Sequence, residues 1–251
     1  MAKQGAMTRE ERMATESIGK LMVSMTFPAI LAQIINILYS IIDRIYIGHM
    51  EGVGANALTG VGVTFCITVF ISAFSAFISN GAAPLAAIWL GKGDREHAEK
   101  ILGNSVSFLM ICTVVLMAFF YAFQRPLLYM FGASDATIGY ATDYLSIYLV
   151  GTLFVELALG LNAFIICQSQ AKTAMFSVLI GAIANIILDP IFIFVLHMGV
   201  KGAATATVIS QGLSAAWVMA FLLGKKSSLK VRKSCMRLDG KILGSVFSLG
   251  I

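Results

Sequence analysis

The sequence predicts an all-α, polytopic membrane protein: a bundle of six transmembrane helices and the start of a seventh. Of the 251 residues, 58% are hydrophobic and only 12% are charged, whereas soluble domains carry about 25% charged residues. Six hydrophobic runs are long enough to cross a bilayer. The runs are continuous, unlike the alternating strands of about 10 residues that build a membrane β-barrel. A helical bundle in lipid is therefore the predicted fold class.

The six runs and the segments between them define the expected domain organisation. The runs lie at residues 21–48, 55–90, 100–123, 139–165, 174–196 and 202–224. We expect a cytoplasmic N-terminal segment at 1–20, a six-helix lobe at 21–224, a basic cytoplasmic linker at 225–241 and a truncated seventh helix at 242–251.

Prolines and a capping residue shape the first three runs. In the first run, Pro28 frees the carbonyl of Ser24 and permits either a static kink or a bend used in function. The second run is too long for one straight span, which predicts a tilted or kinked helix around Pro84. Asp94 precedes the third run and is the expected N-cap of its helix.

The fourth and fifth runs each carry a carboxylate, which is costly in hydrocarbon, on the order of 3 kcal/mol. Glu156 lies near the middle of the fourth run. Asp189 lies in the fifth run, one helical turn after Asn185 and directly before Pro190, which frees the carbonyl of Ile186. This combination predicts a polar site built inside a membrane helix. The sixth run begins with small residues that allow close helix packing.

The distribution of basic residues predicts the orientation. Of the 18 Lys and Arg residues, only Arg44, Arg125 and Lys201 fall on the outer side when the N-terminus is placed in the cytoplasm. This bias follows the positive-inside rule and predicts a multi-pass protein of the plasma (inner) membrane. The basic linker is expected to lie against anionic lipid headgroups rather than to bind nucleic acid.

Four polar side chains from three helices fall in one layer of the outer half. Asp43 and Thr207 lie roughly 8 Å, and Asp189 roughly 10 Å, below the outer ends of their helices, with Asn185 one turn deeper. Two carboxylates this close cannot both ionise cheaply, so one holds a proton or a cation binds between them. Hydrogen-bonded packing contacts are the alternative. Glu156 lies outside this layer and either lines a cavity or makes an interhelical bond.

No catalytic pattern accompanies this layer. The cysteines show no CxxC or paired spacing, which argues against a metal cluster or a disulfide framework. The sequence contains no recognisable nucleophile–base pair or cofactor loop. We therefore expect a protein that is not an enzyme and that needs no cofactor beyond a coupling ion.

The order and spacing of several motifs resemble those of the multidrug and toxic compound extrusion (MATE) family of transporters. The matching pieces are Pro28, Gln33 and Asn36, the segments 43–48 and 91–94, and the segments 185–190 and 199–207. The resemblance covers essentially the whole chain. The segment at 185–190 together with the glycine–alanine run after it is the most specific part.

The resemblance implies an antiporter that exports organic cations or drugs in exchange for H⁺ or Na⁺. It places the cation-coupling site on Asp43, Asn185, Asp189 and Thr207, with Na⁺ an option at the first three. It also implies a helix that bends at Pro28. Gln33 and Asn36 are candidates for lining the cavity, as Glu156 is.

The chain departs from the family in length, because family members have two six-helix lobes around a central cleft. It is expected to be the N-terminal lobe and linker. Its expected partners are the lipid bilayer, small organic cations, and a missing C-terminal lobe or a second copy. Two other functions stay open: a lipid-linked saccharide flippase of the same superfamily, and an inactive lobe or scaffold.

Overall fold

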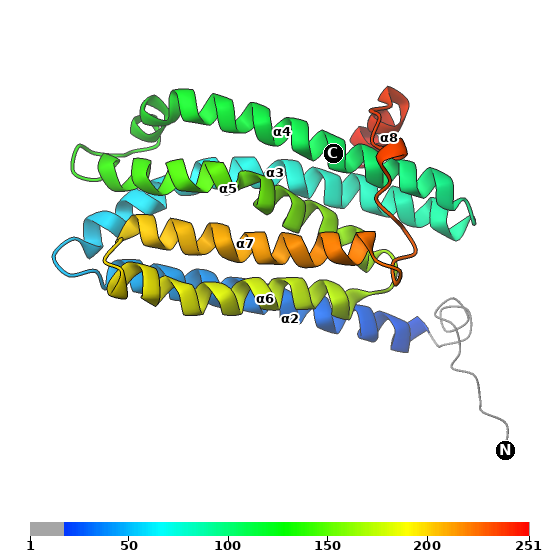
Figure 1. Cartoon of the computed structure of the whole chain (residues 1–251), viewed down its shortest axis with the longest axis horizontal. Coiled ribbons are helices and arrows are strands. Elements are labelled where there is room, and N and C mark those ends of the chain that lie inside the picture. The colour runs from blue at the N-terminus through cyan, green and yellow to red at the C-terminus, as the bar shows by residue number, and fades with distance from the viewer. Residues whose placement is uncertain (1–17, 251) are drawn as a thin grey trace, which may run out of the picture.

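A computed structural model describes residues 18–250 of the chain, and the described part is built of helices. The six long helices run side by side along the length of the molecule (Figure 1). They are α2 (Ile18–Gly48), α3 (Gly54–Gly91), α4 (Arg95–Met130), α5 (Ile138–Ile166), α6 (Ala171–Pro190) and α7 (Val200–Leu223). A short π-helix, η1 (Ile191–Val195), continues α6, and α8 (Gly240–Gly250) follows a linker that contains the 3₁₀ turn η2 (Lys233–Cys235).

The predicted spans agree with these helices, and the largest difference is in α4. This helix begins at Arg95 rather than at 100 and ends at Met130 rather than at 123. Its start is fixed by Asp94, whose Oδ1 accepts a hydrogen bond from the backbone N–H of His97 at 2.9 Å, which confirms the predicted N-cap. Hydropathy marks the part of a helix that lies in lipid, whereas this helix continues beyond its apolar run at both ends. The N-terminal segment predicted at 1–20 lies outside the described residues as far as residue 17.

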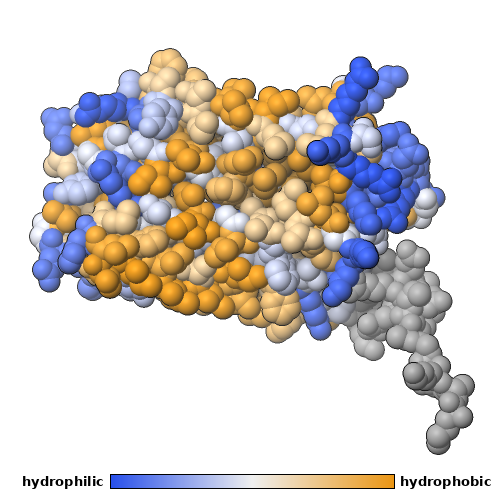
Figure 2. Space-filling model, in the orientation of Figure 1, coloured by the Kyte–Doolittle hydropathy of each residue, from blue (hydrophilic) through white to orange (hydrophobic). Residues whose placement is uncertain are grey.

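Six described helices are long and apolar enough to cross a membrane, so the protein is a multi-pass membrane protein. Figure 2 shows a broad hydrophobic band around the middle of the molecule and hydrophilic residues gathered at its two ends. Large apolar side chains such as Phe27, Ile37 and Phe70 are more than half exposed on this band. Such a surface is compatible with lipid rather than with water.

Helix α5 lies at the centre of the bundle and packs against α3, α4 and α7. Glycines permit these close approaches: a Cβ atom on Gly151 would collide with Val208 of α7, and one on Gly160 with Leu109 of α4. Helix α2 is different, because it packs mainly against α6 and makes few contacts with α3. The bundle is therefore open along α2 and α3, on the side where the polar residues of α2 lie.

We call the end of the bundle that holds the turn between α3 and α4 and the segment after α7 the linker end. Residues 225–240 are docked there on buried polar side chains. Gln168 Oε1 accepts hydrogen bonds from Ser228 N (2.7 Å) and Leu229 N (3.2 Å). Asn104 Oδ1 accepts one from Asp239 N at 2.6 Å. The predicted linker is thus an ordered part of the lobe.

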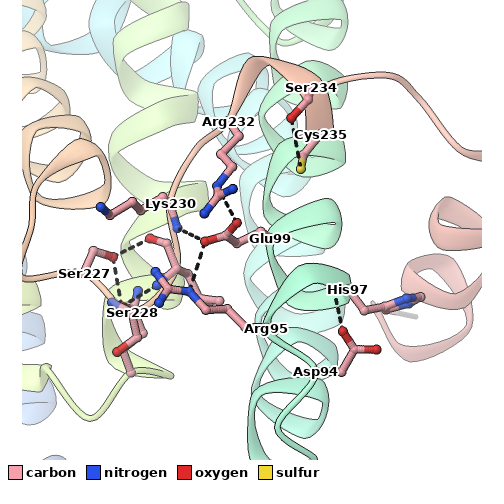
Figure 3. Close-up of polar contacts among 12 residues, drawn as sticks. Asp94, Arg95, His97, Glu99, Ser227, Ser228, Lys230, Arg232, Ser234 and Cys235 are labelled. Atoms are coloured by element: carbon pink, nitrogen blue, oxygen red, sulfur yellow. Dashed lines mark hydrogen bonds and ion pairs between the residues drawn. The ribbon is translucent and has the colours of Figure 1, made fainter.

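Glu99 of α4 forms the third anchor of the linker (Figure 3). Its carboxylate is 3% exposed and pairs with Arg95 Nε at 3.1 Å and with Arg232 Nε at 2.7 Å. It also accepts a hydrogen bond from the backbone N–H of Lys230 at 3.3 Å. Beyond the linker, α8 packs on α3, where the rings of Phe77 and Phe247 lie 4.4 Å apart.

Candidate cation site

The structure brings together the four residues predicted to form a cation site. Asn185 and Asp189 come from α6, Thr207 from α7 and Asp43 from α2. Asn185 Nδ2 donates a hydrogen bond to Asp189 Oδ1 at 3.1 Å and lies 3.5 Å from Thr207 Oγ1. The carboxyl group of Asp43 lies within hydrogen-bonding reach of that of Asp189. Three helices therefore contribute to one polar cluster inside the lobe.

The local backbone of α6 explains how Asp189 is held. Asn185 and Asp189 are four residues apart and share one face of the helix. Pro190 has no N–H group, so the carbonyl of Ile186 loses its usual helical donor. The chain then changes to the wider π-helix of η1, in which Leu196 N donates to Ile191 O at 2.9 Å. Such π-helical turns are frequent at functional sites, and this one begins two residues after Asp189.

The cluster is buried and short of hydrogen-bond donors. Asn185, Asp189 and Thr207 are 1%, 0% and 9% exposed. One oxygen each of Asp43, Asn185 and Asp189 is buried without a hydrogen-bond partner. Burying unpaired acceptors is costly, and two of these three belong to carboxyl groups. A proton or a small cation between the oxygens would remove this cost.

Tyrosines surround the cluster, and sequence reasoning missed them. The hydroxyl group of Tyr144 on α5 interacts with the side chain of Thr207. The hydroxyl group of Tyr39 on α2 interacts with the side chain of Gln211 on α7. The rings of Tyr144 and Tyr148 are stacked, with centroids 6.2 Å apart. Two features of the sequence could have indicated these tyrosines. Tyr144 and Tyr148 are spaced four residues apart in an apolar run, and Tyr39 lies one turn before Asp43.

Two cavities that share part of their lining lie beside the site. The larger, about 520 Å³, lies between α2 and α3 and is reached by Asp43. The smaller, about 70 Å³, extends from Asn185 among α5, α6 and α7. Residues shared by both linings are Asn36, Tyr39, Leu159, Thr207 and Gln211. The smaller cavity has room for a few water molecules beside Asn185.

The other predicted site residues lie in different places. Asn36 lines both cavities, whereas neither Gln33 nor Glu156 is among their lining residues. Gln33 is exposed on α2, and Glu156 is completely buried in α5. Pro28 is buried within α2, and Pro190 is the last residue of α6.

Arg44 does not lie in the cluster that its neighbour Asp43 joins. Its guanidinium group lies 5.6 Å from the centroid of the Phe65 ring, across the larger cavity on α3. The geometry is that of a cation–π contact. Adjacent residues on a helix point about 100° apart, which separates the arginine from the carboxyl pair.

Comparison with known proteins gives one family. A family model described as MatE matches residues 28–191. The chain is 25% identical over 235 residues to the multidrug export protein MepA of Staphylococcus haemolyticus, covering 94% of this chain and 52% of that protein. It is also 25% identical over 210 residues to the FAD transporter of Shewanella oneidensis, covering 82% and 44%. The chain spans about half the length of these relatives.

Solved structures agree with the family match. A crystal structure of MATE in the bent conformation superposes with a TM-score of 0.87 at 24% identity, over 98% of this chain and 54% of that one. A structure titled only "protein A" is 33% identical, with a TM-score of 0.88, over 96% and 53%. The fold of this chain is therefore that of about half of each of these larger proteins.

Proposed function

The chain belongs to the MatE family, and from this we propose that it forms the N-terminal lobe of a multidrug efflux antiporter. The antiporter exports organic cations or drugs in exchange for H⁺ or Na⁺. The coupling cation binds at Asp43, Asn185, Asp189 and Thr207. The relatives named multidrug export protein MepA support the transport class.

One observation carries the coupling proposal: a carboxyl pair with unpaired buried oxygens stands beside an open cavity. Asp43 lines the cavity, and Asp189 lies behind it with no exposed surface. A cation that enters through the cavity reaches Asp43 first and is then shared with Asp189. The oxygens of Asn185 and Thr207 are the further ligands of a Na⁺ site, and a proton shared by the two acids is the other option.

The larger cavity is suited to an organic cation. Aromatic side chains line it, among them Tyr39, Phe65, Tyr144 and Tyr148, and aromatic faces attract cationic groups. Asp43 adds a negative charge on the same wall. Cation binding at the carboxyl pair and drug binding in the cavity therefore compete for one charged residue, which is how exchange of the two is coupled.

Export requires a second lobe facing the open side of α2 and α3. The relatives are about twice as long as this chain, so a C-terminal lobe or a second copy of this chain supplies that wall. The exposed apolar face of α2 lies next to the cavity and faces either lipid or this second lobe.

Ethidium efflux from proteoliposomes tests the proposal. The full chain, with its second lobe where the gene encodes one, should expel ethidium when a pH or Na⁺ gradient is imposed. Asp189→Asn should abolish the gradient dependence, because one shared charge is lost. Asp143→Asn is the matched control, since Asp143 is 46% exposed and pairs with Lys201 at 3.5 Å.

Two results would replace the proposal with an alternative. Gradient-driven efflux that persists in Asp189→Asn contradicts the coupling site. Translocation of a fluorescent lipid-linked saccharide without ethidium efflux would support the flippase. If the chain transports neither compound, and Na⁺ and pH do not change its thermal unfolding, the inactive-lobe alternative is supported.

A further inference from the structure

A second carboxyl group, that of Glu156 on α5, is buried apart from the cation site. Its side chain has no exposed surface, and neither of its oxygens has a hydrogen-bond partner. An ionised carboxylate in such a place, without a partner, is too costly for a membrane protein to maintain. The charge of the Glu156 carboxylate must therefore be neutralised, either by a protein group or by a bound ion.

Helix α4 carries a buried hydroxyl group at the level of Glu156. Helices α4 and α5 run in opposite directions, and Leu109 of α4 packs against Gly160 of α5. One turn from this contact, away from the linker end, the helical repeat brings Thr113 to the level of Glu156. Thr113 is 5% exposed, and its Oγ1 is buried without a hydrogen-bond partner.

A second hydroxyl group comes from α3, which runs parallel to α5. Ser79 Oγ lies 3.2 Å from the carbonyl oxygen of Leu159 and 3.4 Å from that of Gly160. One turn earlier on both helices, Ser75 meets Glu156 and interacts with its carboxyl group. Ser75 is 1% exposed, and its hydroxyl makes no hydrogen bond of good geometry. The four side-chain oxygens of Glu156, Ser75 and Thr113 are therefore all buried without a hydrogen bond of good geometry.

The three helices that pack most extensively against α5 supply no charge at the level of Glu156. Helix α3 has no charged residue, α4 has none between Lys100 and Arg125, and α7 has none after Lys201. The ionisable groups that interact with Glu156 are the Cys112 thiol of α4 and the phenol of Tyr148, which lies two turns earlier on α5. Neither carries a positive charge. Neutralisation therefore depends on an ion taken up from outside the protein.

We propose that Glu156 is a second proton-binding site of the lobe, with Ser75 and Thr113 as its hydrogen-bond partners. A protonated carboxyl group has one O–H donor and acceptor oxygens, and each hydroxyl is both donor and acceptor. The neutral acid can therefore donate to one hydroxyl and accept from the other. Divalent cations favour six or more oxygens, whereas these three side chains offer four.

The proton reaches this site from the larger cavity. Ser72 and Tyr148 both line that cavity. Ser72 is one turn from Ser75 on the same face of α3, a rise of about 4.5 Å. Hydroxyl groups therefore lead from the cavity wall to Glu156. Once bound, the proton links α3, α4 and α5 at a position distinct from the pair of Asp43 and Asp189.

Infrared spectroscopy of the full chain in lipid tests this site. The double variant Asp43→Asn/Asp189→Asn removes the carboxyl groups of the cation site from the spectrum. At neutral pH this variant should still show the carbonyl stretch of a protonated carboxyl group. Adding Glu156→Gln should remove the band, since exposed acids are ionised at that pH.

The hydroxyl partners provide an independent readout. Ser75→Ala and Thr113→Val should keep the band and move it to higher frequency, because each removes one hydrogen bond to the acid. Glu156→Gln should unfold near the wild-type temperature, since glutamine resembles the neutral acid in size and hydrogen bonding.

Two outcomes overturn the proposal. If Glu156→Gln leaves the carboxyl region of the spectrum unchanged, Glu156 is not protonated. If Na⁺ at constant pH abolishes the band in the double variant, the site takes a metal ion and not a proton.

Discussion

At the residue scale, Asn185 links α6 to α7 within the cluster. Its amide donates to Asp189 and lies close to Thr207. Its own side-chain oxygen is one of the buried oxygens without a partner. The residue therefore both stabilises a carboxylate and offers a ligand oxygen, two roles that a side chain with only one kind of polar group cannot fill.

Asn185→Leu is predicted to destabilise the lobe and weaken cation binding. Loss of the donor leaves Asp189 without its hydrogen bond, at a cost of about 1–3 kcal/mol. The stabilisation that Na⁺ or protons give in thermal unfolding should fall as well, because that stabilisation follows the binding constant.

Asn162→Leu is the control for Asn185→Leu. Asn162 also lines the smaller cavity, and it accepts a hydrogen bond from Ser177 at 3.2 Å. Its removal should lower stability to a similar extent and leave the cation dependence intact. If Na⁺ and protons stabilise the two variants equally in thermal unfolding, Asn185 is not part of the cation site.

At the element scale, the linker after α7 depends on a few buried acceptors. Glu99 is the charged acceptor among them. Arg95, Arg232 and the backbone N–H of Lys230 all contact its carboxylate. Hydrogen bonds to charged groups are about twice as strong as those between neutral groups. The carboxylate therefore orders a basic segment that would otherwise repel itself.

Glu99→Gln is predicted to loosen the linker without unfolding the helices. Losing about 1–2 kcal/mol of local stability increases the open population roughly five- to thirty-fold. Trypsin should then cleave near Arg232 and Lys233 faster by a similar factor, measured by mass spectrometry of the fragments.

Glu96→Gln provides the matched control for the linker variant. Glu96 pairs with Lys100 at 2.9 Å, but its side chain is 77% exposed. Exposed ion pairs contribute little, so cleavage should keep its wild-type rate. If trypsin cleaves the linker at the same rate in both variants, the linker is held by contacts other than those of Glu99.

At the scale of the whole molecule, the orientation in the membrane stays a prediction based on the basic residues. Ala136 is exposed in the turn between α4 and α5, and Lys226 is exposed in the linker at the other end. In a background without the four native cysteines, an impermeant maleimide should label Ala136→Cys in intact cells. It should label Lys226→Cys only after permeabilisation, and the reverse pattern would invert the topology.

The sequence predicted the number of spans and most of their limits, because lipid imposes a length and a composition on each helix. It also singled out the four polar residues that the structure brings together, since polar groups in apolar runs stand out; their role in cation binding stays a prediction. It did not predict which face each helix turns inward. Helices such as α3, α5 and α7 are apolar on every side, so the pattern that orients a helix in a soluble protein is missing.

Glu156 and the tyrosines are the residues whose positions could not be predicted without that pattern. The sequence left Glu156 as either a cavity residue or an interhelical contact, and the structure places it away from both cavity linings. Tyr144 and Tyr148 are apolar in bulk, and their spacing of four residues did not by itself assign them to the site. Their roles depend on tertiary packing of α5 against α3 and α7, which only the folded structure specifies.

The docked linker has a mechanical consequence. Anchors on Glu99 and Asn104 of α4 and on Gln168, in the turn between α5 and α6, hold it to the bundle, so the linker and the lobe move as one rigid body. The docked linker thereby fixes the orientation of α8 relative to the lobe.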